Sequence, residues 1–456
     1  MAPGAIGEHP RTKRRSAGAL LIVNAEVGGA ANLDVRCRDG RVVEIGRGLA
    51  TSAAEDSFDA HGGALLPGLN DHHTHLLALA AARRSVACGP PSVTTRTELA
   101  AALRAAPGGD WIRGVGYHES VAGMLDKHSL DGIRDDRPVR IQHRSGKMWF
   151  VNSLAARRLG IETGEGQLFR LDGLLRDRLA EDDDLVAAVA ETSRLLSGYG
   201  ITGVTDATYT NDKTTESLYR KLDVCQHVNL MGDESLDSGS LKIMLDDTAL
   251  PDVDGLQERI AQAHRRGRPV AFHCVTRTEL VFALAALRHA GTLPGDRIEH
   301  ASVTDAPTLR LLHEVSGEEG NVTVVTQPNF IAERGDDYLR DVPVEDHDNL
   351  YRCRGFLEAG IPLGGGTDSP FGDPNPWAAM RAAVERRTTD GRIVGANETL
   401  SPKQALGLFL TPLDSPGGVP RRVVVGAPLD FCILAKRWHE ARDSLAAELV
   451  TRTISY

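Results

Sequence analysis

The stretch LNDHHTHL, residues 69–76, places three histidines and an aspartate directly after an LPG tripeptide. Residues i and i+2 of a strand point to the same face. His73 and His75 can therefore reach one point, as two ligands of one cation must. His72 is out of phase, and we expect it to point the other way and to pack or to support a ligand. Asp71 is in phase with the pair, so it either ligates or orients a ligand.

The chain beyond this stretch alternates β-prone and helical segments. Helical patterns at 255–267 and 279–291 fall between several apolar segments. Strands alternating with helices favour a parallel sheet, and eight such units close a barrel with its active site at the carboxyl ends of the strands. The predicted fold class is α/β, a (β/α)8 TIM barrel. The predicted strands lie at 63–69, 200–207, 241–245, 269–274, 297–302, 322–327 and 361–368.

The two ends of the chain differ from this middle region. Residues 19–27 are apolar and β-prone, and 33–46 are predicted as two strands joined at Asp39-Gly40, a dipeptide favoured in hairpin turns. Residues 421–435 are predicted as strand, turn, strand. Both ends are therefore expected to build one small β-sandwich domain around the barrel.

The segment from about 85 to 195 does not follow the strand–helix rhythm, and we interpret it as one or two barrel strands plus an inserted lobe. The predicted domains follow from these patterns. They are a disordered tail at 1–18, the N-terminal half of the β-sandwich at 19–66, the barrel at 67–417 with its inserted lobe at about 85–195, and the C-terminal half of the β-sandwich at 418–456.

Composition excludes several classes of protein. The 456 residues carry a formal charge of −10, from 52 Lys+Arg against 62 Asp+Glu, which disfavours nucleic-acid binding. No run approaches the ~20 apolar residues that span a bilayer, and the first residues lack the apolar stretch of a signal peptide. The six cysteines form no CxxC pair, so neither a disulfide framework nor a cysteine zinc site is indicated. We expect a cytoplasmic protein without membrane or nucleic-acid partners.

Further metal-competent side chains end other predicted strands. His273 ends VAFH, His300 ends RIEH and Asp368 ends LGGGTD. One such residue alone is usually a satisfied polar group near a core, but four strands ending in this way are hard to explain by packing. Imidazole and carboxylate together suit zinc, and also manganese, iron or nickel.

Lys242 lies inside the apolar segment SLKIML, where an unpaired lysine costs on the order of several kcal/mol. Two interpretations stay open. The ammonium either reaches the barrel mouth or pairs with Asp246 or Asp247, or the lysine has lost its charge and become a ligand.

Several motifs together resemble one family. LPGLNDHHTHL resembles the PGxxDxHxH opening of the amidohydrolase superfamily, and RIEHASV, GIPLGGGTDSPF and LSPKQAL resemble its later signatures. HRSGKMWFVNSLA and SLKIMLDD are similar to amidohydrolase family 3, the branch of N-substituted formamide deformylase-like metal-dependent hydrolases. The resemblance covers about 19–456. It implies a metal-dependent (β/α)8 barrel with a β-sandwich built from both chain ends.

The resemblance also implies roles for the residues above. One or two divalent ions, with zinc as the first candidate, would be held by the two strand-one histidines and by four later residues. Lys242 matches a lysine that many members carry as a carbamate bridging two metals. Asp368 is implied as metal ligand and proton shuttle, and His300 or His273 as the group that stabilises the oxyanion if one metal is bound. The implied ligands are His73, His75, Lys242, His273, His300 and Asp368; the implied catalytic residues are Asp368 and His300.

This chain departs from the family-3 pattern at two places. Gly146-Lys147 stands where members often have Gly-His, which would suit an anionic substrate. HCVTR at 273–277 stands where the pattern has HAxGD. Both changes alter the wall of the site rather than its chemistry. The predicted substrate contacts, each with a structural role as its alternative, are Lys147, Asn152, Asn329 and Trp377.

The predicted function is hydrolysis of a carbon–nitrogen bond in a small-molecule amide or N-substituted formamide, with Asp368 as general base and then acid. Lactone or other ring opening, deamination and phosphoester hydrolysis are alternatives on the same site. A catalytically silent scaffold is the alternative outside catalysis. The retained ligands argue against it. A homo-oligomer is left open.

Overall fold

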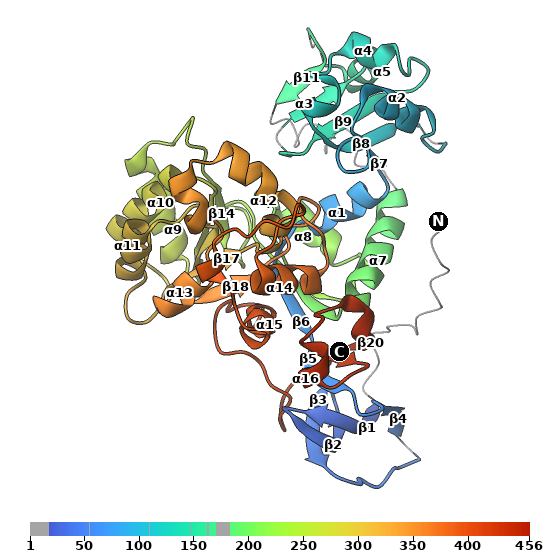
Figure 1. The fold of residues 1–456 in the computed structure, drawn as a ribbon, viewed down its shortest axis with the longest axis vertical. Coiled ribbons are helices and arrows are strands. Elements are labelled where there is room, and N and C mark those ends of the chain that lie inside the picture. The colour runs from blue at the N-terminus through green and yellow to red at the C-terminus, as the bar shows by residue number, and fades with distance from the viewer. Residues whose placement is uncertain (1–17, 54, 109, 147, 162–163, 170–182) are drawn as a thin grey trace. The chain divides into compact units, whose positions relative to one another are not determined.

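A computed structural model describes residues 18–456 apart from 54, 109, 147, 162–163 and 170–182 (Figure 1). The predicted tail at 1–18 therefore lies, except for its last residue, outside the described residues, and so does Lys147. Contacts divide the chain into two compact units. One comprises the chain up to His75 and from Ser193 onward, and the other is Leu76–Thr192.

Two parallel sheets form the centre of the first unit. One has the order β13-β12-β6 and the other the order β14-β15-β16-β17-β18. Six of these strands match predicted ones, β6 shares only its first residue with the strand predicted at 63–69, and the sequence patterns did not predict β13. Their bounds are β6 (Leu69–Thr74), β12 (Ile201–Asp206), β13 (His227–Leu230), β14 (Leu241–Met244), β15 (Val270–Cys274), β16 (Asp296–His300), β17 (Val322–Thr326) and β18 (Leu363–Gly365).

Backbone contacts link the two sheets at both of their edges. Gly232 and Leu241 form an isolated parallel bridge between the chain after β13 and the start of β14. At the other edge, the Asp368 N–H donates to the His73 carbonyl at 2.8 Å. A Cβ on Gly366 would lie 2.8 Å from the His73 backbone nitrogen. Glycine at 366 therefore lets the chain after β18 lie directly against β6.

Helices separate most of these strands. The helices α9, α10 and α11 pack side by side, as Figure 1 shows, and the amphipathic α9 and α10 match the predicted helical patterns. The helices of this unit are α8 (Lys213–Tyr219), α9 (Val253–Arg265), α10 (Arg277–Ala290), α11 (Ala306–Ser316), α12 (Asn329–Asp341), α13 (Arg354–Glu358), α14 (Pro376–Glu385), α15 (Pro402–Leu410) and α16 (Trp438–Ala441). Short 3-10 helices lie at Val344–Asn349, Ala396–Glu398 and Ala447–Leu449.

Both chain ends build one seven-stranded sheet, as expected. Its order is β20-β19-β5-β1-β2-β3, with β4 on β1. Asp39 and Gly40 join β2 to β3 with φ of 49° and 74°, the backbone of a type I′ turn. The predicted strand at 421–425 is wrong, because only β19 forms in that region. The strands are β1 (Ala19–Val27), β2 (Ala30–Arg38), β3 (Arg41–Gly46), β4 (Glu55–Asp59), β5 (Ala64–Pro67), β19 (Asp430–Leu434) and β20 (Val450–Ser455).

The predicted strand at 63–69 is divided between two sheets. Its first residues form β5 of the terminal sheet, and the histidine stretch lies inside the next strand, β6. Gly68 separates them, where a Cβ would lie 2.1 Å from the Thr202 hydroxyl. The chain therefore crosses from one sheet to the other at a position too crowded for a side chain.

The second unit has its own five-stranded sheet, of order β11-β10-β9-β8-β7. The expectation that 85–195 contributes barrel strands is wrong, because β7–β11 pair with one another. Its elements are α1 (Leu76–Arg83), β7 (Val86–Ala87), α2 (Arg96–Arg104), β8 (Ile112–Tyr117), α3 (Glu119–Ala122), α4 (Lys127–Asp131), β9 (Val139–His143), β10 (Met148–Val151), α5 (Ser153–Leu159), β11 (Gln167–Phe169) and most of α7 (Asp183–Gly198). Among the described residues, no helix is long and apolar enough to cross a membrane.

Candidate metal centre

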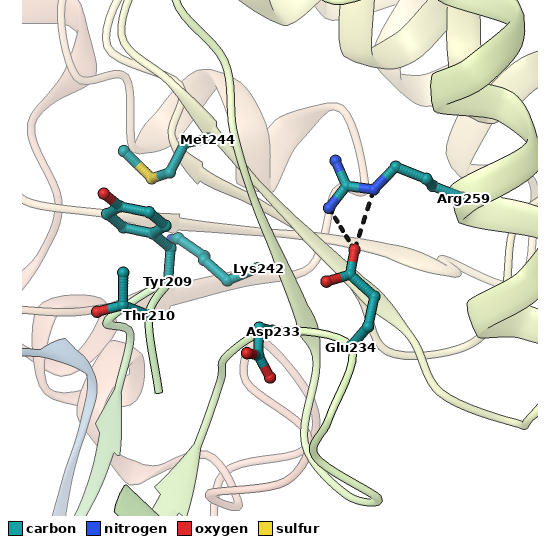
Figure 2. Close-up of a pocket in the computed structure, with 7 residues that line it drawn as sticks. All are labelled: Tyr209, Thr210, Asp233, Glu234, Lys242, Met244 and Arg259. Carbon is teal, nitrogen blue, oxygen red and sulfur yellow. Dashed lines mark hydrogen bonds and ion pairs between the residues drawn. The ribbon is translucent and has the colours of Figure 1, made fainter. Parts of the chain in front are cut away.

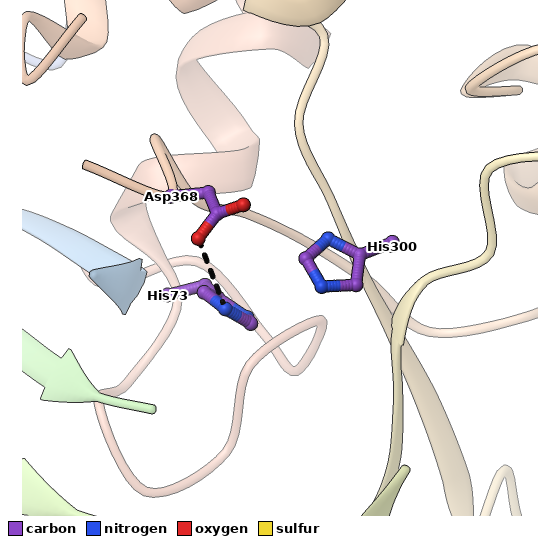
Figure 3. Close-up of side chains that lie close together, drawn as sticks. All are labelled: His73, His300 and Asp368. Atoms are coloured by element: carbon purple, nitrogen blue, oxygen red, sulfur yellow. Dashed lines mark ion pairs between the residues drawn. The ribbon is translucent and has the colours of Figure 1, made fainter. Parts of the chain in front are cut away.

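His73, His300 and Asp368 come together at the carboxyl ends of three strands (Figure 3). One potential ligand atom from each lies within 4.8 Å of the others. Asp368 Oδ1 is 3.4 Å from Nε2 of His73 and 3.2 Å from Nε2 of His75. The i and i+2 histidines of β6 therefore face the same carboxylate, as strand phase requires.

His273 joins the group through His300. Its Nδ1 lies 2.9 Å from His300 Nε2, so one of these two nitrogens carries a proton and donates it to the other. A cation bound between them would take the place of that proton. The sequence-predicted ligands on β6, β15, β16 and after β18 are thus neighbours in the structure, and their role as ligands stays a prediction.

Two of these residues adopt a strained backbone. His300 has φ of 69° and Asp368 has φ of 54°, a left-handed region that costs a residue with a side chain about 1–3 kcal/mol. In a regular strand Glu299 and His300 would point to opposite faces. Both nevertheless lie against the His73 ring, so the left-handed turn at the end of β16 brings two consecutive side chains to one site.

Each of three histidines is held by its Nδ1 atom. His73 Nδ1–H donates to Glu299 Oε2 at 2.5 Å, and His300 Nδ1 lies 2.7 Å from Gln327 Oε1. His75 Nδ1 is 2.7 Å from the Thr208 hydroxyl. Metal-binding histidines commonly use one ring nitrogen for the ion and the other for such a partner. These contacts leave Nε2 of each ring facing the cluster.

The electrostatics favour neutral imidazoles beside an ionised carboxylate. Burial, assisted by the charge of Lys242, lowers the pKa of His73 to about 3. Burial also lowers the pKa of His273 and of His300. For Asp368, burial alone would raise the pKa, but the neighbouring histidines outweigh it and hold it below its usual range. Metal ligands must be deprotonated in this way.

Lys242 lies near the cluster from β14. Its side chain is buried, and its Nζ has no hydrogen-bond partner among the described residues. Burial is the main reason that its pKa falls to about 8, with Arg297 adding to the effect and Glu299 opposing it. The predicted pairing with Asp246 or Asp247 is not formed within the described region of the chain.

These observations fit a divalent cation. The donor set combines neutral imidazole nitrogens with a carboxylate, the chemistry of zinc and related ions. Asp368 Oδ1 and Lys242 Nζ are buried and without hydrogen-bond partners in the described structure. A buried polar atom of this kind calls for an explanation such as an ion.

A cavity of about 370 Å³ opens beside Lys242 (Figure 2). Tyr209 and Met244 lie on its wall and are 42% and 38% exposed. Tyr209 directly follows Thr208, the partner of His75, and the charge of Lys242 acts on His73, so two lining residues connect the cavity with the histidine cluster. Its lining is completed by Thr210, Asp233, Glu234 and Arg259, of which Glu234 accepts two hydrogen bonds from Arg259.

The remaining sequence-predicted residues serve the fold. Asn152 is fully buried, and its amide caps α5 and bonds four backbone groups. Trp377 is fully buried, with Nε1–H donating to the Tyr199 carbonyl. Both residues thus fill the structural role that was their alternative, and their contact with substrate stays a prediction. Asn329 donates to the Thr367 carbonyl and so supports the residue before Asp368.

Two further residues of the stretch 69–76, His72 and Asp71, form hydrogen bonds to the segments around the site. His72 points away from the cluster, as predicted, and its Nε2 lies 2.8 Å from the Thr411 hydroxyl. Asp71 accepts hydrogen bonds from the Thr367 hydroxyl and from the Thr367 and His73 N–H groups. Of the two roles left open for Asp71, orienting the ligand segments is the one these bonds favour.

Three residues that contact the histidines were not predicted from the sequence: Glu299, Gln327 and Thr208. The first leaves a signal in RIEH, where Arg297 and Glu299 occupy one face of a strand predicted to be buried. Charged residues in such a strand indicate a functional site. Gln327 and Thr208 leave no comparable signal, because uncharged polar residues after a strand are common.

Eight parallel strands with a histidine–aspartate cluster at their carboxyl ends define a class, the metal-dependent barrel hydrolases. The family model described as "Amidohydrolase family" matches residues 56–437. The chain belongs to this family, which implies a TIM-barrel fold, and the protein is a metal-dependent amidohydrolase.

Known proteins agree with this placement. The chain is 24% identical to the N-substituted formamide deformylase of Arthrobacter pascens, over 86% of this chain and 88% of that protein. The solved structure of an uncharacterised metal-dependent hydrolase from Pyrococcus horikoshii OT3 superposes with a TM-score of 0.73 at 19% identity, over 92% of this chain and 97% of that one. One from Pyrococcus furiosus gives 0.70 at 21% identity, over 92% and 99%.

Proposed function

We propose that this protein hydrolyses the carbon–nitrogen bond of a small amide, and that an N-substituted formamide is the first substrate to test. The observation that carries the proposal is the buried Asp368 carboxylate, whose Oδ1 lies 3.4 Å from Nε2 of His73 and 3.2 Å from Nε2 of His75, and whose pKa the neighbouring histidines hold below its usual range. Similarity to an N-substituted formamide deformylase over most of both chains supports this choice of substrate.

His73, His75, His273, His300 and Asp368 would hold the ion, with zinc as the first candidate. A divalent ion at such a site lowers the pKa of a bound water from about 15.7 toward about 7 and polarises a carbonyl oxygen. The chain supplies rigid, deprotonated ligands for it. The Nδ1 partners Glu299, Thr208 and Gln327 fix the rings.

Asp368 is the proposed proton carrier. Its carboxylate accepts the proton of the attacking water and then delivers it to the nitrogen of the breaking bond, so that the amine leaves as a neutral group. The neighbouring histidines hold the pKa of Asp368 below its usual range, so the carboxylate is ionised, which is the form that can accept a proton. The products are a carboxylic acid, formic acid in the first candidate reaction, and an amine.

His300 fits a ligand better than an oxyanion donor. Its Nδ1 is bonded to the Gln327 oxygen, so Nε2 of the neutral ring carries a lone pair. A second proton is disfavoured, because burial lowers the pKa of this ring. We therefore propose His300 as a ligand and assign the proton transfer to Asp368.

Lys242 is the proposed site of a carbamate. A neutral lysine amine adds to carbon dioxide with loss of one proton, which leaves a negative group with two oxygens. The buried, unpartnered Nζ and its pKa of about 8 support the neutral amine that this reaction requires. Such a group would give the site room for a second ion.

The cavity beside Lys242 is the proposed substrate site. Exposed aromatic and thioether groups such as those of Tyr209 and Met244 favour an apolar portion of a ligand. The charge of Glu234 is already paired with Arg259. An uncharged amide therefore suits this wall better than the anionic substrate that Lys147 suggested.

The proposal also covers the closure of the barrel, the terminal β-sandwich and the location of the protein in the cell. We propose that the eight parallel strands close into one barrel through the contacts at Gly232–Leu241 and Asp368–His73, and that the terminal sheet belongs to a β-sandwich. We also propose a cytoplasmic location. All six cysteines are free thiols, which a reducing compartment preserves.

The test is a hydrolysis screen of the zinc-loaded protein over N-substituted formamides, N-acyl amines, cyclic amides and lactones, with amine or acid release as the readout. We expect turnover of at least one open-chain amide, and none by Asp368→Asn at the same zinc content. Turnover confined to lactones, or ammonia release from ring amines alone, would contradict the amide assignment. A protein that binds no metal and is indifferent to chelators would be a scaffold.

A further inference from the structure

Arg297 and Glu299 form a charged pair inside β16. They are two residues apart and share one face of the strand, and their side chains are 3% and 0% exposed. The two groups lie 2.8 Å apart. Apolar branched residues usually fill the inside of such a barrel, and a buried ion pair often stabilises a fold no better than apolar residues of the same volume. The pair therefore calls for a functional explanation.

The pair is bonded to the strand that carries the histidines. Glu299 Oε2 accepts from His73 Nδ1–H at 2.5 Å. Arg297 Nη2–H donates to the same Oε2 at 3.2 Å and to the His72 carbonyl at 2.7 Å. One guanidinium thus holds both the carboxylate and the β6 backbone next to His73.

These contacts determine which nitrogen of His73 faces the cluster. An ionised carboxylate can only accept hydrogen bonds, so the ring proton lies on Nδ1 and Nε2 keeps its lone pair. Thr208 and Gln327 hold the rings of His75 and His300 through neutral groups. Among the Nδ1 partners of these three rings, Glu299 alone carries a charge, and such a partner raises the basicity of the other ring nitrogen, Nε2 of His73.

We propose that Glu299 is a positioning residue that makes His73 the strongest ligand of the metal centre, and that Arg297 holds the Glu299 carboxylate in place. This inference deepens the proposed metal site and rests on it. It does not depend on which bond the enzyme cleaves.

The experiment compares Glu299→Gln with Glu279→Gln. Gln at 299 keeps the size and one acceptor oxygen but removes the charge. Glu279 is a matched control, because it is also a buried carboxylate, 4% exposed, but accepts only from the backbone N–H groups of Asp247, Val275 and Thr276. The readouts are the zinc dissociation constant, from competition with a coloured chelator, and the thermal unfolding of the metal-free protein.

We expect Glu299→Gln to bind zinc about 10- to 100-fold more weakly, the range found for partners of metal-binding histidines, and Glu279→Gln to bind it as the wild type does. Zinc binding by Glu299→Gln within about twofold of wild type would overturn the proposal. A lower unfolding temperature of the metal-free variant together with unchanged zinc affinity would also overturn it, since it would show a purely structural role.

A second variant keeps the test decisive if Glu299→Gln does not fold. The double variant Arg297→Met/Glu299→Gln removes both charges and leaves no unpaired ion. We expect it to fold and to bind zinc as weakly as the single variant, and wild-type affinity would contradict the proposal. Failure of the proposed function is separate: wild type that binds zinc but cleaves no amide leaves the role of Glu299 standing. Wild type that binds no zinc overturns both.

Discussion

The three histidines of the opening stretch have different roles within four residues. His73 and His75 face Asp368, whereas His72 faces Thr411. We predict that His73→Ala and His75→Ala lose bound metal and activity. His72→Ala should keep its metal content but lose about 1–3 kcal/mol of stability, because the buried hydrogen bond between the imidazole and the Thr411 hydroxyl is lost. Metal analysis by mass spectrometry and thermal unfolding check both. Loss of metal by His72→Ala with retention by His73→Ala would contradict the assigned faces.

The proposed proton transfer by Asp368 can be tested with a single substitution. Asp368→Asn keeps the size and one ligand oxygen but cannot take up a proton. We predict that kcat falls by a factor of about 10² or more, while the zinc content falls only modestly. Rate measurements at matched zinc occupancy separate the two effects. A variant with near-normal kcat would remove Asp368 from the proton transfer.

For Lys242 the sequence left two chemical forms open, a charged ammonium and an uncharged lysine that becomes a ligand. We predict that Lys242→Ala loses metal and activity, and that a small added carboxylate such as acetate or propionate restores some of both by occupying the place of the carbamate. The same carboxylate added to wild type should have no such effect. No rescue at any concentration, together with an unmodified Nζ in a crystal of the active enzyme grown with bicarbonate, would defeat the carbamate.

At the scale of elements, the strands with long apolar runs were predictable and one short strand was not. β13 has four residues, none of them fully buried, and it leads to β14 without a helix. It therefore lacks both the apolar run and the strand–helix rhythm. In the second unit the strand–helix rule gave the opposite error and predicted barrel strands that do not form. The strands β7, β8 and β9 are parallel, as barrel strands are. Their pattern resembles barrel strands although they form a separate sheet.

The positions of the proposed ligands were predictable because strand ends can be read from the chain, whereas the partners of these ligands were not. His300 and Asp368 both lie toward the ends of predicted strands, at 297–302 and 361–368. Glu299 bonds His73 only because the chain turns left-handed at His300, a backbone conformation that no residue in RIEH demands. Contacts between residues more than 200 positions apart depend on how the strands are placed, which a single sequence does not state.

Gly366 is where the last strand meets the first. A Cβ at this position would lie 2.6 Å from the His73 Cβ and 2.8 Å from its backbone nitrogen. We predict that Gly366→Ala destabilises the protein by about 1–3 kcal/mol, the usual effect of overpacking, and lowers its zinc content. Gly407→Ala is the control. It lies inside α15 with open space around it, and it should stabilise by about 0.5–1 kcal/mol. Equal effects of the two changes would contradict the close approach.

At the scale of the whole molecule, the ion should act as a fold stabiliser. Its proposed ligands lie on or next to β6, β15, β16 and β18, which come together only in the folded chain. A ligand present at about 100 times its dissociation constant adds about 2.7 kcal/mol to stability. We predict that a chelator lowers the unfolding temperature and that zinc restores it. An unfolding temperature that is the same with and without chelator would speak against a resident ion.

The contact between the first and the eighth parallel strands has a consequence for how the protein is made. His73 leaves the ribosome roughly 300 residues before Asp368, an interval of about 15–60 s at about 5–20 residues per second. During that time the nascent chain displays a pair of histidines without the carboxylate that they share in the finished fold. The full set of proposed ligands therefore exists only once Asp368 has been synthesised, and we expect stable metal loading no earlier than that point of translation.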